Sequence, residues 1–158
     1  MASRSHNEML LQLVTERFDP ISAAIRFSTR SCVSHAEFVD PATGSTFGAR
    51  CTGVKWRTVH ASRRYTCVLR FSAPGINQAF RWALTQAGKS YDFSAIGGIA
   101  LDRNWRDSRR WFCSELIAAA FEAAGCPLLS PSANVWRITP RDLVLSMQLV
   151  PLSGISIP

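Results

Sequence analysis

Apolar residues recur at helical spacing in several stretches of the chain. The clearest stretch is 113–124, and Gly125 follows it where a left-handed C-terminal cap is expected. The residues that share its predicted buried face are Leu116, Ile117, Ala120, Phe121 and Ala124. The same spacing predicts a helix from Gly75 to about Ala87 and shorter helices at 7–17, 21–27 and after Pro140.

Two of these helices also carry start signals. Asp19-Pro20 precedes 21–27, and Thr139-Pro140 precedes the last helix, whose first turn holds Asp142. In each pair the polar residue is a predicted N-cap and proline takes the first helical position, where its missing N–H is not needed.

Alternating polar and apolar residues predict a strand at 32–39. Its two central polar residues, His35 and Glu37, share one face with Val33 and Val39. Turn-forming residues at 40–45 separate this strand from a return strand that begins at 46. Further strands are predicted at 64–71 and 145–152, and 89–110 is predicted to be a long, partly irregular connection.

The length and composition favour one globular domain. A chain of 158 residues can bury a real core, so we expect a single domain over 1–158, with a short helical extension at about 1–19. No apolar run approaches the roughly 20 residues that cross a membrane, and the first 20 residues do not resemble a secretory signal. We therefore expect a cytoplasmic protein, with export by another route or association with a virion left open.

The chain is basic, with a formal net charge of +7. Basic proteins bind nucleic acid, anionic polymers or membrane surfaces, but a solvated basic surface is the preferred explanation here. The arginine-rich segment 102–110 also contains two aspartates, and no nucleic-acid-binding motif is present. We expect no specific nucleic-acid partner.

The five cysteines are Cys32, Cys51, Cys67, Cys113 and Cys126. Their odd number and the absence of a Cys-x-x-Cys pair argue against a disulfide framework and against a structural zinc site. The spacing of Cys32 and His35 would suit a metal, but no second pair of ligands accompanies them. We expect neither a metal nor a cofactor.

Cys113 is the candidate nucleophile because it stands where a helix begins. Backbone N–H groups and the positive end of the helix dipole at such a position favour the thiolate, the reactive form of cysteine. The alternative is structural, since most buried cysteines only fill space. Leu116 and Ile117 follow Cys113 by three and four residues. This spacing places Cys113 on the same inward face of the helix.

A cysteine nucleophile needs a base, and His35 is the best placed of the three histidines. His6 lies near the terminus and His60 in a polar, basic turn. Alternate strand residues lie about 6.6 Å apart, so Glu37 can reach the His35 ring. The alternative is an exposed polar strand face. Asp40 and Asp92 are two further acidic candidates.

Five segments, in this order, resemble the circularly permuted papain-like cysteine hydrolases, the YiiX-like branch of the NlpC cell-wall peptidase superfamily. They are SHAEFV at 34–39, GSTFGARCTGVKWR at 44–57, Tyr91-Asp92, WFCSEL at 111–116 and ITPRDL at 138–143. The histidine precedes the cysteine, as in the permuted branch, and the likeness covers roughly residues 20 to 145.

The resemblance implies an α+β fold of the permuted papain-like, NlpC type, in which a small antiparallel sheet packs on helices. It also implies catalytic roles for Cys113 as nucleophile and His35 as base. The third residue varies in such proteins, and Glu37 is our choice here. Such enzymes act on amide or ester bonds of cell-wall peptides or lipids.

The sequence thus leaves three functions open. The first is a thiol hydrolase acting on a peptide, a peptidoglycan fragment or another acyl substrate. The second is an acyltransferase or thioesterase acting on lipid, which the apolar residues Trp105, Trp111 and Phe112 would suit. The third is a non-catalytic binding or structural protein of a phage or secretion apparatus. The oligomeric state is not predicted.

Overall fold

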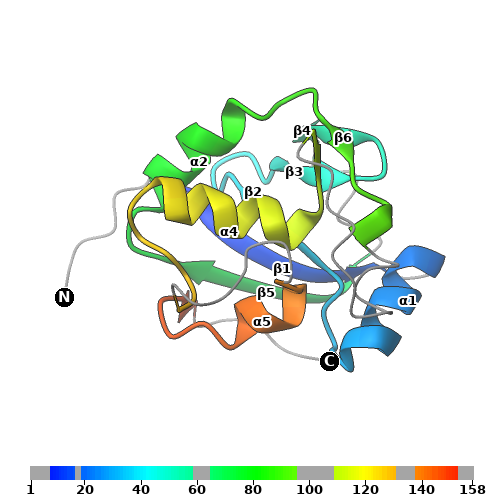
Figure 1. Ribbon diagram of the computed structural model, residues 1–158. Coiled ribbons are helices and arrows are strands. Elements are labelled where there is room, and N and C mark those ends of the chain that lie inside the picture. Colours follow the sequence, from blue (N-terminus) through cyan, green and yellow to red (C-terminus); the bar gives the residue numbers. More distant parts are fainter. Residues whose placement is uncertain (1–7, 17–18, 59–64, 96–108, 131–137, 153–158) are drawn as a thin grey trace.

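The computed structural model describes residues 8–16, 19–58, 65–95, 109–130 and 138–152 (Figure 1). Six strands form one sheet in the order β4-β3-β2-β1-β5-β8, and each neighbouring pair is antiparallel. The strands are β1 (Leu10–Glu16), β2 (His35–Val39), β3 (Thr46–Arg50), β4 (Gly53–Arg57), β5 (Tyr65–Ser72) and β8 (Val150–Pro151). The expected α+β class with a small antiparallel sheet is confirmed.

The helix predicted at 7–17 is wrong, because residues 10–16 form β1. This strand pairs with β2 on one side and with β5 on the other, so it is not a helical extension. Leu10, Leu11, Leu13 and Val14 are all buried. A strand that is covered on both faces has no alternation of polar and apolar residues. Its continuous apolar run cannot be distinguished from the apolar face of a short helix.

A hairpin joins β2 to β3 where the sequence predicts it. Phe38 pairs with Phe47, and Asp40 accepts backbone and hydroxyl hydrogen bonds inside the turn. The sequence predicts one return strand, but the structure has two. A second turn at 51–52 ends β3 and leads into β4. Gly53 makes that turn with φ +90°, and a Cβ there would lie 2.8 Å from the Lys89 carbonyl oxygen.

Two helices, α2 (Ile76–Leu84) and α4 (Cys113–Ala123), pack on each other and on the sheet (Figure 1). Phe38 of β2 contacts Phe80 of α2 and Phe121 of α4, with ring centroids 5.4 and 6.3 Å apart. The predicted α4 is confirmed, and Gly125 after it has φ +72°. The predicted α2 is too long, since residues 85–88 turn back and the Gly88 N–H reaches the Val54 carbonyl.

The predicted helix starts are confirmed in α1 (Pro20–Thr29) and α5 (Pro140–Val144). The Asp19 carboxylate accepts two backbone N–H bonds of α1, and Thr139 and Asp142 cap α5 reciprocally. The last strand is shorter than predicted, because residues 145–149 lie outside it. No described helix has the length and apolar character needed to span a membrane.

The connection at 89–110 contains two short parallel strands, β6 (Ser90–Tyr91) and β7 (Arg110–Trp111). β7 leads through Phe112 directly into α4. Residues 96–108, which include Trp105, lie outside the described residues, as do His6 and His60.

Candidate active site

Cys113 is the first residue of α4, as predicted. Phe112 before it has extended backbone angles, and its N–H donates to the Glu115 carboxylate at 3.4 Å. The Cys113 side chain is fully buried with Leu116 and Ile117, which confirms the inward face. The thiol therefore lies in the protein interior, at the helix end whose first backbone N–H groups have no partner within the helix.

His35, the first residue of β2, contacts both of the other predicted site residues. The Cys113 thiol lies close enough to the His35 ring to raise its pKa, and Nε2 of the ring lies 3.2 Å from Oε2 of Glu37. His35 is buried, with 7% of its surface exposed. The structure thus brings together Cys113, His35 and Glu37 from opposite halves of the chain.

The electrostatic setting keeps the His35 ring charged. Burial alone would lower the pKa of His35, because it disfavours the charged imidazolium. The charge of the Cys113 thiolate, the hydrogen bond to it and the Glu37 carboxylate together outweigh burial and raise that pKa from 6.5 to about 10. A pKa of about 10 leaves the ring protonated at neutral pH, next to the Cys113 sulfur and the Glu37 carboxylate.

Glu37 is fully buried and accepts hydrogen bonds on both carboxylate oxygens. Gln12 at 3.1 Å and the Tyr65 hydroxyl at 2.8 Å donate to Oε1. Nε and Nη2 of Arg50 donate to Oε2, at 3.2 and 3.0 Å, beside His35. Burial would raise the pKa of Glu37, but His35 first, and then Tyr65 and Gln12, hold it below its usual value. Glu37 is therefore a fixed anion.

Gly48 supplies the space that this carboxylate occupies. It faces Glu37 across the β2–β3 ladder, and a Cβ on Gly48 would lie 3.0 Å from the Glu37 Cβ. A larger residue would therefore push against the strand position that aims Glu37 at His35.

Three residues of this network were not among the predicted site residues: Gln12, Arg50 and Tyr65. Gln12 was hidden by the helix predicted over β1, although it stands opposite Glu37 in the observed register. Arg50 could have been found, since the 40–45 turn sets it opposite His35. Tyr65 reaches Glu37 from β5, two strands away, and no local signal in the sequence indicates that contact.

The two other acidic candidates have structural roles in the turns where they lie. The Asp40 side chain binds Ala42 N–H and the Thr43 hydroxyl in the hairpin turn. Oδ1 of Asp92 accepts the N–H groups of Ser94 and Ala95 at 2.9 and 3.3 Å. Glu37, the acid chosen from the sequence, is the one that contacts His35.

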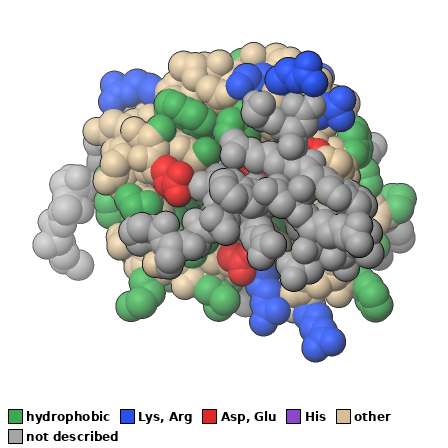
Figure 2. All heavy atoms as spheres, viewed as in Figure 1, with side chains coloured by type: hydrophobic (Ala, Val, Ile, Leu, Met, Phe, Trp, Pro, Cys, Tyr) green, Lys and Arg blue, Asp and Glu red, His purple; other side chains and the backbone are tan. Residues whose placement is uncertain are grey.

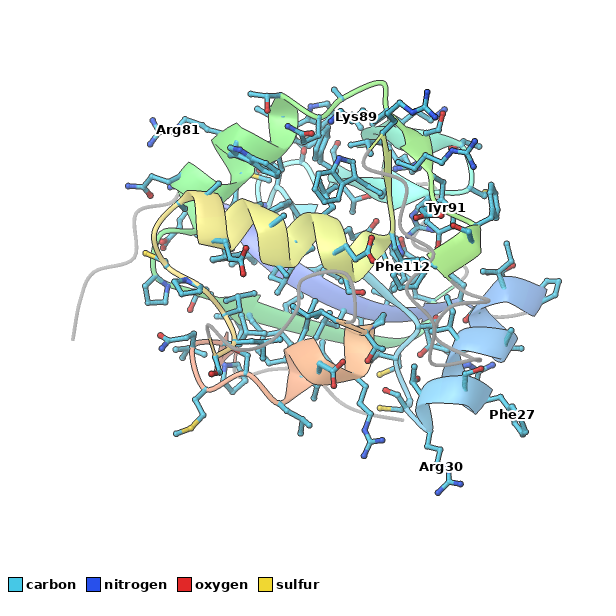
Figure 3. The ribbon with its side chains drawn as sticks, in the orientation of Figure 1. Phe27, Arg30, Arg81, Lys89, Tyr91 and Phe112 are labelled. Atoms are coloured by element: carbon cyan, nitrogen blue, oxygen red, sulfur yellow. The ribbon has the colours of Figure 1, made fainter. Side chains whose placement is uncertain are left out.

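A cavity of about 250 Å³ opens beside His35, and we call it the α1 pocket. Its lining residues are Glu16, Asp19, Ile21, Ser22, Ile25, Ser34, His35, Arg50, Cys51 and Tyr91. Tyr91 lies with Phe112 at the start of α4, their ring centroids 5.8 Å apart (Figure 3). Burial first, and then the Cys113 charge, raise the pKa of the Tyr91 hydroxyl, so it stays protonated.

One face of the molecule shows how the positive charges of the described residues are distributed. On the face shown in Figure 2, the Lys and Arg side chains of the described residues lie in separate groups and not in one continuous patch. Arg81 and Lys89 mark two of these positions in Figure 3.

The fold is that of a YiiX-like α+β protein. No protein-family model matches the chain, and no curated protein matches it. Among solved structures it is similar to the crystal structure of YiiX from Escherichia coli O157:H7, with a TM-score of 0.65 and 18% sequence identity. The match covers 96% of this chain and 98% of YiiX, and at this identity it shows the fold alone.

YiiX is a metalloprotein, and a metal ion in such a fold needs a group of suitable donor side chains. Among the described residues, no three His, Cys, Asp or Glu side chains are grouped so that they could hold a metal ion. Both oxygens of Glu37 are already engaged by Gln12, Tyr65 and Arg50. The residues of this site do not fit a resident metal.

Proposed function

We propose that this protein is a cysteine hydrolase that cleaves an amide or ester bond of an acyl substrate. Cys113 is the nucleophile, His35 the acid–base residue and Glu37 the residue that orients His35. The observation that carries this proposal is the contact of the His35 ring with both the Cys113 thiol and the buried Glu37 carboxylate. This is the arrangement that an activated cysteine requires.

The imidazolium has two N–H donors, one for each partner. The Glu37 carboxylate accepts a hydrogen bond from Nε2 of His35. Because Glu37 is held in place, this bond fixes the orientation of the imidazole ring. The raised pKa of His35 means that the proton stays on the ring beside the sulfur at neutral pH. His35 therefore already carries the proton that a leaving group needs when substrate arrives.

The reaction then proceeds in two steps. The Cys113 sulfur attacks the acyl carbon and forms an S–C bond, the bond to the leaving amine or alcohol breaks, and His35 gives its proton to the leaving group. Water next loses a proton to His35 and attacks the thioester. The acid is released and the cysteine restored, with one water consumed.

Two groups suit the oxyanion that forms during each step. The backbone N–H of Cys113 is at a helix start and has no partner within the helix. The Tyr91 hydroxyl lines the α1 pocket and is held in its protonated, donating form.

The permuted papain-like assignment and a peptide or peptidoglycan substrate belong to this proposal. The order of the site, His35 before Cys113, supports the permuted assignment, and the cysteine–histidine chemistry supports an acyl substrate of this kind. The lipid alternative has less support, because Trp111 and Phe112 are buried and offer no apolar surface to a lipid.

Trapping of the acyl-enzyme tests the proposal. The full chain would be mixed with activated acyl esters and with peptidoglycan fragments, and intact mass would be followed after an acid quench. We expect one acyl group on Cys113, none in Cys113→Ala, and an unchanged adduct in the matched control Cys126→Ala. Turnover that persists in Cys113→Ala would overturn the proposed role of this residue.

A further inference from the structure

Two of the other cysteines, Cys32 and Cys67, lie close to each other. Cys67 of β5 pairs directly with Thr15 of β1, so their side chains share one face of the sheet. The Thr15 hydroxyl donates to the carbonyl oxygen of Cys32, in the segment between α1 and β2. This bond ties the backbone of Cys32 to the strand residue beside Cys67. Burial first, and then the neighbouring Cys32 thiol, raise the pKa of Cys67, as expected for two thiols that lie close together.

Solvent reaches this pair more readily than it reaches the site. Cys32 is exposed and Cys67 is partly exposed, whereas Cys113 is fully buried. A thiol reagent in solution therefore meets the Cys32–Cys67 pair first.

The backbone around the pair allows the sulfurs to approach. A disulfide needs sulfur atoms about 2.05 Å apart and Cα atoms usually within about 6.8 Å. Cys67 is fixed in the β1–β5 ladder, but Cys32 belongs to no helix or strand. Two residues after Cys32 the segment is tied to β1, where the Ser34 N–H donates to the Val14 carbonyl at 2.9 Å.

We propose that Cys32 and Cys67 form a reversible disulfide and are a thiol-oxidation site separate from Cys113. The oxidant is a small disulfide such as glutathione disulfide. One thiolate attacks it and releases one glutathione, and the second thiolate then displaces the other. The protein loses two hydrogens, one S–S bond forms in place of another, and two reduced glutathiones leave.

The bond would join two segments that support the site. Cys32 lies three residues before His35, and Cys67 lies two residues after Tyr65, which donates to Glu37. The two cysteines are 35 positions apart, and a cross-link over such a loop restricts the unfolded chain. We expect the oxidised protein to have a Tm higher by about 5 °C or more.

The experiment needs no substrate, so it is independent of the proposed hydrolase. The full chain would be equilibrated in glutathione buffers of increasing oxidised fraction, quenched with a maleimide and mapped by peptide mass spectrometry. We expect a Cys32–Cys67 linked peptide, which Cys32→Ser abolishes and the control Cys51→Ser retains. Glutathione attached separately to the two cysteines, a link to another cysteine, or two free thiols in glutathione disulfide alone would overturn the proposal.

Discussion

The two faces of β2 are built from opposite kinds of side chain. Phe38 enters a cluster of aromatic rings, Phe80 and Phe121 among them, that joins the sheet to α2 and α4. Its neighbour Glu37 is just as deeply buried, yet it is surrounded by charged and polar donors. One strand of five residues therefore carries both the core of the fold and the candidate site.

The aromatic face of β2 therefore stabilises the fold, whereas the polar face sets the pKa of His35. Apolar burial is favourable for each ring, whereas a buried carboxylate is tolerated only when its hydrogen bonds are complete. A network of this kind is weak evidence for stability and better evidence for a site that needs a fixed charge.

The largest effect on stability is expected on the aromatic face. Phe38→Ala would leave a cavity between the sheet and both helices, and should reduce the free energy of unfolding by about 3–5 kcal/mol. The pKa of His35 should stay raised in the folded variant. Denaturant unfolding and an NMR titration of the His35 ring measure the two quantities, and a large fall in the pKa of His35 would show that the faces are not separate.

Glu37→Gln should reduce the free energy of unfolding by less, about 2–3 kcal/mol, because hydrogen bonds to a charged group are lost while the shape is kept. It should also lower the pKa of His35, whose proton Glu37 stabilises. Asp40→Asn is the matched control, since Asp40 lies in the hairpin turn. An unchanged His35 titration in Glu37→Gln would contradict the orienting role.

The same carboxylate predicts an acid dependence of stability. The pKa of Glu37 in the folded protein is below its ordinary value of 4.5. Its contribution is therefore complete above about pH 4.5 and is lost as pH falls through the lower, folded-state pKa. Unfolding free energies measured from pH 7 downward should fall less steeply in Glu37→Gln than in the original protein, and equal slopes would count against this assignment.

The smallest effect is expected at Tyr65. Tyr65→Phe removes one hydrogen bond to Glu37 while Gln12 and Arg50 continue to donate, so a loss of about 1–2 kcal/mol is expected. The unfolding midpoint in urea checks it. A loss as large as that of Phe38→Ala would mean that the network, and not the aromatic core, dominates the stability of β2.

The sequence predicts correctly those features that depend only on residues close together in the chain. The start of α4 at Cys113 and the shared face of His35 and Glu37 follow from spacing within short segments. The strand β1 could not be recognised in the same way, because its burial on both faces comes from the rest of the fold. With β1 missed, Gln12 could not be assigned to the site.

The measurement that tests the central claim most directly is the rate of Cys113 alkylation as a function of pH, followed by peptide mass spectrometry. Because Cys113 is buried, each rate would be compared with its own plateau at high pH. We predict that Cys113 reacts well below pH 8, and that His35→Ala shifts its profile to higher pH while those of Cys51 and Cys126 stay unchanged. A Cys113 profile that is the same with and without His35 would contradict the thiolate–imidazolium pair and, with it, the hydrolase.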